Sequence, residues 1–167
     1  MRNIVAKNAL NDCRLELIKI FKLINQYGSF NTATCFLTKY ALVKVSGTLE
    51  VCYKTIIADY YDSFTPELQR FISKQVREAS CNATYDNIIK TLTLFDESKG
   101  KQLKAIVKEF DPHNTSTISL SDLNKARNNV AHGLPTTMSF IDIQRNFYKS
   151  LFILQKLDSV LSYELPK

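Results

Sequence analysis

The chain has 167 residues, of which 45% are hydrophobic and 23% are charged, and this is the composition of an ordinary globular protein. A chain of this length fits one domain, so we expect residues 1–167 to form a single domain. Its four Gly and four Pro are too few for the many tight turns of a β-sandwich or barrel. The formal net charge of +6 favours an anionic partner, such as nucleic acid or an acidic protein, without choosing between them.

The cysteine and histidine pattern argues against a metal-dependent function. The four cysteines form no CxxC pair, and the chain has only two histidines, whereas the ligands of a zinc site cluster at short spacing. Each cysteine lies within a helical pattern, so we expect buried thiols in a reducing compartment. These residues are Cys13, Cys35, Cys52 and Cys81. We therefore expect no metal and no cofactor.

The apolar stretches of the chain are short and are interrupted by charged residues. The N-terminal segment lacks the unbroken apolar run of a signal peptide. No stretch reaches the roughly 20 apolar residues that are needed to span a bilayer. We expect a cytoplasmic protein with no membrane-spanning segment.

The first half of the chain contains four segments in which apolar residues recur at helical spacing. The first, about 3–27, ends at Tyr27-Gly28, because glycine commonly follows a helix. The second, about 32–62, has one continuous apolar stripe of the kind that fills a bundle core. Its members are Leu37, Ala41, Val45, Leu49, Cys52 and Ile56. Thr65-Pro66-Glu67 has the features of a helix start and predicts a helix over about 66–79, with another over about 83–95.

The next segment is a Lys-rich helix over about 98–110, which Asp111-Pro112 is expected to end. The composition of residues 113–117 is typical of a loop. Ser119 and Ser121 then offer caps for a helix over about 121–132.

The C-terminal part of the chain has clear signals for the end of one helix and the start of the next. Gly133, with Pro135 two residues later, is a strong stop signal. Ser139 and Asp142 resemble a capping box for a last helix over about 140–162. The sequence therefore predicts an all-α bundle of four to seven helices.

The most informative stretch is Arg127-Asn128-Asn129-Val130-Ala131-His132, at the end of one predicted helix and just before the last one. The imidazole of His132 titrates near neutral pH, so it could remove the proton of a ribose 2′-hydroxyl or protonate a departing 5′-oxygen. The guanidinium of Arg127 could bind a phosphate through two parallel hydrogen bonds. Asn128 lies one turn before His132 and could orient the imidazole or contact the phosphate.

This stretch resembles the signature of the HEPN superfamily, which is an Arg, a polar residue, three variable positions and a His. Its position just before the final helix is also similar to that of the family's motif. The resemblance implies a metal-independent endoribonuclease that leaves a 2′,3′-cyclic phosphate. It also implies a homodimer in which two motifs share one cleft. The surrounding residues are similar to stand-alone HEPN nucleases of bacterial toxin and phage-defence systems, which implies RNA as substrate and an antitoxin or regulatory protein as a partner. Many HEPN proteins have a Tyr two residues after the motif His, but this chain has Leu134 there, so no role of that Tyr carries over.

Each motif residue also has a purely structural interpretation. Positions five apart on a helix differ by about 140°, so Arg127 and His132 converge only if the helix ends near His132 or if the site is shared across an interface. His132 could simply interact with the last helix carbonyls. Arg127 could pair with an acid such as Asp122 or Asp142.

Other charged residues near the motif are candidates for supporting roles. Glu50 lies in an apolar neighbourhood and could hold Arg127 or tune His132, although an ion pair with Lys54 at i+4 is slightly favoured. Three basic residues flank the motif and could form a rim that binds RNA phosphates, or could be an ordinary solvated surface. They are Lys125, Arg145 and Lys149.

Three hypotheses follow, in decreasing order of preference. The first is an HEPN endoribonuclease with Arg127, Asn128 and His132 as its catalytic residues. The second is a catalytically silent HEPN module that binds RNA, a nucleotide or a protein. The third is an unrelated helical scaffold in which the motif arises by chance.

Overall fold

The computed structural model describes residues 1–28, 31–62 and 65–162. Within these ranges the chain is helical and has no strand, so the predicted all-α fold is confirmed. The elements are α1 (Ile4–Tyr27), α2 (Thr32–Tyr61), α3 (Pro66–Ile72), a π-helical turn η1 (Ser73–Arg77), α4 (Tyr85–Phe95), α5 (Glu97–Phe110), α6 (Thr115–Ala131) and α7 (Phe140–Ser162). The predicted boundaries of α1, α2, α4, α5 and α7 agree with these to within about two residues.

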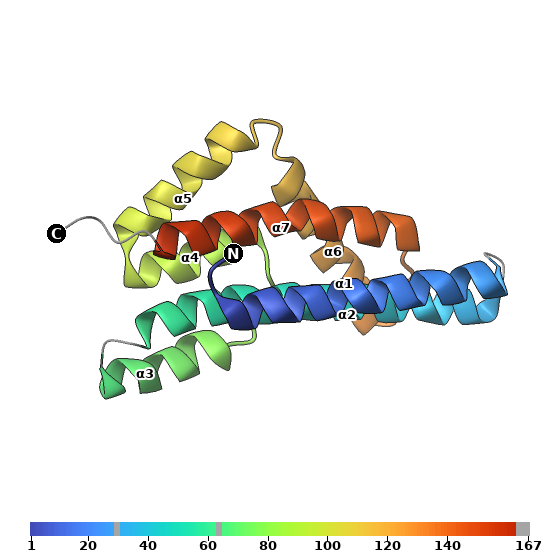
Figure 1. Cartoon of the computed structure of the whole chain (residues 1–167), viewed down its shortest axis with the longest axis horizontal. Coiled ribbons are helices and arrows are strands. Elements are labelled where there is room, and N and C mark those ends of the chain that lie inside the picture. Colours follow the sequence, from blue (N-terminus) through green and yellow to red (C-terminus); the bar gives the residue numbers. More distant parts are fainter. Residues whose placement is uncertain (29–30, 63–64, 163–167) are drawn as a thin grey trace.

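The long helices α1, α2 and α7 lie along the long axis of the molecule, and α6 crosses them (Figure 1). Helix α2 is central, because it packs against α1, α3, α6 and α7. Helices α4 and α5 form a pair, of which α5 packs against α7. The arrangement places the C-terminal end of α6 between α2 and the start of α7.

The apolar stripe predicted on α2 lies in the core except for Leu37 at its start, which is only half-buried. On α2, Ala41, Val45, Leu49 and Cys52 are fully buried, and Ile56 is nearly so. Helix α7 buries its own stripe against them: Phe140, Ile143, Phe147, Leu154 and Leu161. Burial of two long apolar faces against each other supplies the main driving force for this bundle.

The expected helix caps at Thr65 and Ser139 are present. The hydroxyl of Thr65 accepts a hydrogen bond from the Leu68 amide at the start of α3. At the start of α7 the Asp142 amide donates to the Ser139 hydroxyl at 3.2 Å, and the Ser139 amide donates to Asp142 Oδ2 at 3.3 Å. This reciprocal pair is the capping box that the sequence predicts.

Two boundaries differ from the prediction. Helix α6 begins at Thr115, inside the segment predicted to be a loop, and Ser119 and Ser121 lie within the helix instead of capping it. The reason is Asp111, whose carboxylate accepts hydrogen bonds from the backbone amides of Thr115 and Ser116. The helix predicted over 66–79 is shorter, because α3 ends at Ile72 and continues as a π-helical turn to Arg77.

The cysteines are free thiols in different environments. Cys13 and Cys52 are buried as expected, and burial raises the pKa of the Cys52 thiol to about 12. Cys81 is half-buried, and the expectation of burial is wrong for Cys35, which is exposed on the first turns of α2. Among the described helices, none combines the length and the apolar character required to cross a membrane.

Candidate active site

The motif lies on the last turns of α6, and this helix is fixed at both ends. At its start, the Asp111 carboxylate accepts hydrogen bonds from the amides and hydroxyls of Thr115 and Ser116. Burial opposes ionisation of this carboxyl group, but the four donors outweigh it and lower the pKa of Asp111. The negative charge at this position also complements the positive end of the helix.

The C-terminal end of α6 is a Schellman motif. The Leu134 amide donates to the Asn129 carbonyl at 2.8 Å, and the Gly133 amide donates to the Val130 carbonyl at 3.1 Å. Gly133 has a φ of +72°, a left-handed conformation that favours glycine. The helix therefore ends at His132, which satisfies one of the two conditions for Arg127 and His132 to converge.

Arg127 is half-buried, and its Nη1 donates to Asn128 Oδ1 at 3.2 Å. It forms no ion pair with any carboxylate of the described residues, so the pairing with Asp122 or Asp142 is not present. Asp142 instead pairs with Arg145, within the first turns of α7. The guanidinium of Arg127 keeps most of its donors for an external group.

His132 is exposed at the C-terminal cap of α6. Its backbone amide donates to the Asn128 carbonyl at 3.0 Å. Its imidazole makes no hydrogen bond or ion pair within the part of the chain that the structure describes, so it does not bind the last helix carbonyls. Both ring nitrogens are therefore open to solvent or to a ligand.

Residues 79–84, the segment before α4, are hydrogen-bonded to two side chains of α6, Asn124 and Asn128. The buried amide of Asn124 donates to the Ala83 carbonyl at 2.8 Å. One turn later, Asn128 Oδ1 accepts from Asn82 Nδ2 at 3.4 Å, and Asn87 Nδ2 donates to the Asn82 carbonyl at 3.0 Å. Arg127 Nη1 and Asn82 Nδ2 therefore share Asn128 Oδ1 as their acceptor, which links the motif to the 79–84 segment.

Sequence reasoning missed these positioning residues, Asn82, Asn87 and Asn124. One signal was available: Asn124, Asn128 and His132 recur every four residues and so form one polar stripe on α6. The contacts across to residues 82 and 83 are long-range, and no local pattern indicates them.

Among the described residues, Glu50 makes no hydrogen bond or ion pair with Arg127, Asn128 or His132. Its Oε1 lies 2.6 Å from Lys54 Nζ, one turn later on α2, and Lys54 is buried and also donates to the Ala79 carbonyl. The ion pair favoured from the sequence is therefore present. Lys54 helps to hold the first residue of the 79–84 segment, which gives this pair a structural role.

The three flanking basic residues occupy different places. Lys125 and Arg145 line one open hollow of about 560 Å³ between α6 and α7, together with Asp122 and Asp142. Lys149 is exposed and is not among the residues that line it. The hollow contains carboxylates as well as cations, so it is a mixed-charge surface and not a purely basic rim.

The family assignment rests on a comparison of the whole sequence with protein-family models. The model described as RiboL-PSP-HEPN matches residues 8–163, which include every candidate site residue. The chain belongs to this HEPN family. The searches of curated proteins and of solved structures find no match for the chain.

The candidate site residues of this HEPN chain have side chains of the kinds that acid–base chemistry uses. Across the described residues, no group of three or more His, Cys, Asp or Glu side chains is placed to hold a metal ion. The candidate residues at the C-terminal end of α6 carry a guanidinium, a carboxamide and an imidazole, of which the first two are hydrogen-bonded to each other. These three can bind an anion and transfer a proton.

Proposed function

We propose that this HEPN protein is a metal-independent endoribonuclease with Arg127, Asn128 and His132 as its catalytic residues. The observation that carries the proposal is that the fold uses neither of the two key side chains in an ion pair. Arg127 has no carboxylate partner, and the His132 imidazole has no hydrogen bond, among the described residues. Groups that the fold leaves unpaired at the end of a helix remain available to bind an anion and to transfer a proton.

The chemistry follows from the three side chains. The imidazole removes the proton of the ribose 2′-hydroxyl, and the 2′-oxygen attacks the adjacent phosphorus. The bond to the 5′-oxygen breaks, that oxygen takes up a proton, and the upstream product keeps a 2′,3′-cyclic phosphate. The Arg127 guanidinium and the Nδ2 group of Asn128 stabilise the charge on the non-bridging oxygens.

The proposal includes a homodimer with a composite site. The reaction needs a base and an acid, but one chain supplies one imidazole at the site. His113 precedes the start of α6, and 17 helical residues separate it from His132 by about 25 Å. A second copy would bring its own motif to the same cleft and supply the second group. In this proposal the protein acts as a toxin or phage-defence effector, held in check by an antitoxin or regulatory protein.

The test uses purified protein and 5′-labelled single-stranded RNA in excess EDTA. We compare the unmodified protein with His132→Ala and with His113→Ala, which removes the other, exposed imidazole and serves as the matched control. Cleavage should leave a 2′,3′-cyclic phosphate, fall by about 10²–10⁴-fold in His132→Ala and persist in His113→Ala. The activity per chain should also fall on dilution if two copies form the site.

Two results would contradict the proposal. Equal loss in both variants would show that the imidazole at position 132 has no special role. Binding of RNA without cleavage, in a protein that is still dimeric, would favour the alternative of a catalytically silent RNA-binding HEPN module.

A further inference from the structure

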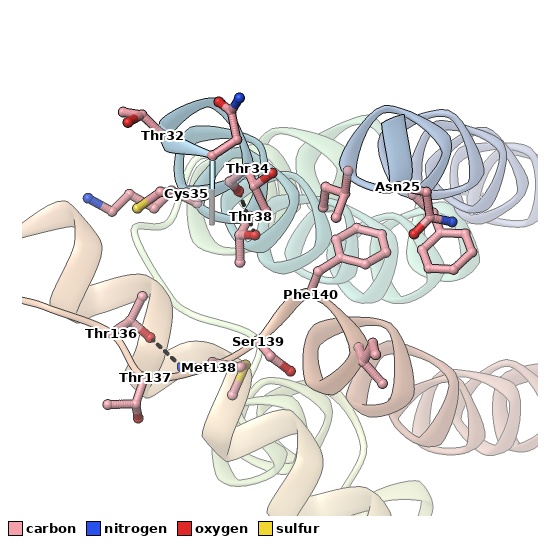
Figure 2. A pocket seen from close by; sticks show the side chains of 15 residues that line it. Asn25, Thr32, Thr34, Cys35, Thr38, Thr136, Thr137, Met138, Ser139 and Phe140 are labelled. Carbon is pink, nitrogen blue, oxygen red and sulfur yellow. Dashed lines mark hydrogen bonds between the residues drawn. The ribbon is translucent and has the colours of Figure 1, made fainter. Parts of the chain in front are cut away.

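A cavity of about 580 Å³ lies where the end of α1, the start of α2 and the segment before α7 meet. Figure 2 shows Cys35 and Thr38 of α2 on one side of it and Met138 and Ser139 on the other. Its volume is in the range of sites for small ligands. The segment that closes it, residues 136–140, follows the motif helix by only a few residues.

The lining combines an apolar wall with free hydrogen-bonding groups. The rings of Phe21 and Phe140 stack with their centroids 6.0 Å apart at an interplanar angle of 16°, and Phe21 remains 40% exposed. The same cavity is lined by Asn25, Thr32 and Lys39. Their side chains make no hydrogen bond or ion pair with other residues that the structure describes. A carboxamide that offers both a donor and an acceptor beside an apolar surface suits the edge and face of a nucleobase.

The cavity is joined to the hollow between α6 and α7, which Asn129 of the motif stretch lines. Thr136, Thr137 and Met138 line both of them, so the two form neighbouring parts of one surface. In the hollow, Arg145 is paired with Asp142, so Lys125 is the cation without a carboxylate partner among the described residues that could contact a phosphate, while the cavity holds the hydrogen-bonding groups. A single RNA strand bound at the motif could follow this surface with its backbone over the hollow and a base in the cavity.

We infer that this cavity is a nucleobase subsite of the RNA substrate, in which Asn25 reads the base edge and the Phe21 side chain, one turn earlier on α1, contacts its face. The inference rests on the proposed ribonuclease function, because it places the base on the same strand that the motif cleaves. Lys39 at the rim contacts a neighbouring phosphate. The subsite gives the protein a preference among bases that the motif residues alone do not provide.

The test measures binding separately from cleavage, in the full-length protein with His132→Ala so that the RNA remains intact. The probes are the four labelled homopentamers of RNA and a pentamer of the same backbone without bases. The comparison is between Asn25→Ala and Gln26→Ala, a neighbouring exposed amide that does not line the cavity. Loss of one neutral hydrogen bond should weaken the preferred homopentamer by about twofold to tenfold in Asn25→Ala and leave Gln26→Ala unchanged.

Cys35 provides a second measurement, because this exposed thiol lines the cavity while Cys13 and Cys52 are buried. The preferred homopentamer should slow alkylation of Cys35 several-fold, as followed by peptide mass spectrometry, and the base-free pentamer should protect it much less. Equal protection by both probes, or an unchanged base preference in Asn25→Ala, would overturn the subsite even if the protein cleaves RNA. Absence of cleavage by the unmodified protein, with binding and base preference intact, would overturn the nuclease proposal and keep the cavity as a base-binding site.

Discussion

The hydrogen bond from Asn124 to the Ala83 carbonyl should contribute substantially to the free energy of unfolding, because both groups are buried. Asn124 is 5% exposed and Ala83 is 1% exposed, and the two groups meet at 2.8 Å. Asn124→Ala would leave the buried carbonyl without this donor, which costs about 1–3 kcal/mol. The second acceptor, the Leu120 carbonyl, lies within α6 itself and should be less affected.

Asn129→Ala is the matched control, because it makes the same change on the same helix at an exposed position. Both changes gain the helix propensity of alanine, about 0.5 kcal/mol, so the difference between them isolates the buried hydrogen bond. We expect urea unfolding followed by circular dichroism to show Asn124→Ala less stable than Asn129→Ala by about 1–3 kcal/mol. For a chain of this size that corresponds to roughly 2–4 °C of melting temperature per kcal/mol. A difference below about 0.5 kcal/mol would refute the reasoning.

Three further predictions concern the ends of α6 and the ion pair on α2. Asp111→Ala should lower the free energy of unfolding by about 1–3 kcal/mol at pH 7. Because the folded-state pKa of Asp111 is lowered, its contribution to the free energy of unfolding is present above the unfolded pKa of about 3.9 and is lost as the pH falls through the folded pKa. The free energy of unfolding in urea should therefore depend less on pH in the acid range in the variant. Gly133→Ala should cost about 1–2 kcal/mol in the same assay, since an added Cβ meets nothing within 4 Å and the penalty comes from the φ of +72° alone. Glu50→Gln should lower stability by about 1–3 kcal/mol through the buried Lys54 but change RNA cleavage by less than about twofold; a much larger loss of cleavage in a stable variant would place Glu50 in the site.

The helices were predictable because their signals are local. Apolar spacing on α2 and α7, the Thr65 cap and the Ser139–Asp142 capping box all depend on residues within one or two turns of each other. The stop at Gly133 was predictable for the same reason. These features place the motif at the end of a helix from sequence alone.

The early start of α6 was not predictable in the same way. Asp111 ends one helix in the sequence pattern, and the carboxylate of the same residue caps the next helix across a tight turn. That turn needs Asn114 in the left-handed conformation, with a φ of 54°. Each role of Asp111 is local, but the sequence pattern does not show that one residue serves both, as the C-cap of α5 and the acceptor at the start of α6.

The network behind the motif was also beyond sequence reasoning, because it joins residues that are far apart in the chain. The Asn82–Asn128 contact spans 46 positions, and the Asn124–Ala83 contact spans 41. Polar residues in these positions look like ordinary surface residues until the fold brings the 79–84 segment against α6. The same holds for Lys54, whose partner carbonyl lies 25 positions away.

The composition of this network has an electrostatic consequence for the site. The side chain that Arg127 contacts is the carboxamide of Asn128, and the residues linked to it in turn, Asn82 and Asn87, are also carboxamides, which satisfy hydrogen bonds without adding charge. A carboxylate about 4 Å from the guanidinium would attract it by about 4 kcal/mol at an effective dielectric constant of 20, and it would repel a phosphate in the same place. Two candidate acids, Glu50 and Asp142, are instead paired with Lys54 and Arg145. The fold thus gives Arg127 a neutral hydrogen-bond partner and no ion pair among the described residues, which is what the proposed binding of an RNA phosphate at this position requires.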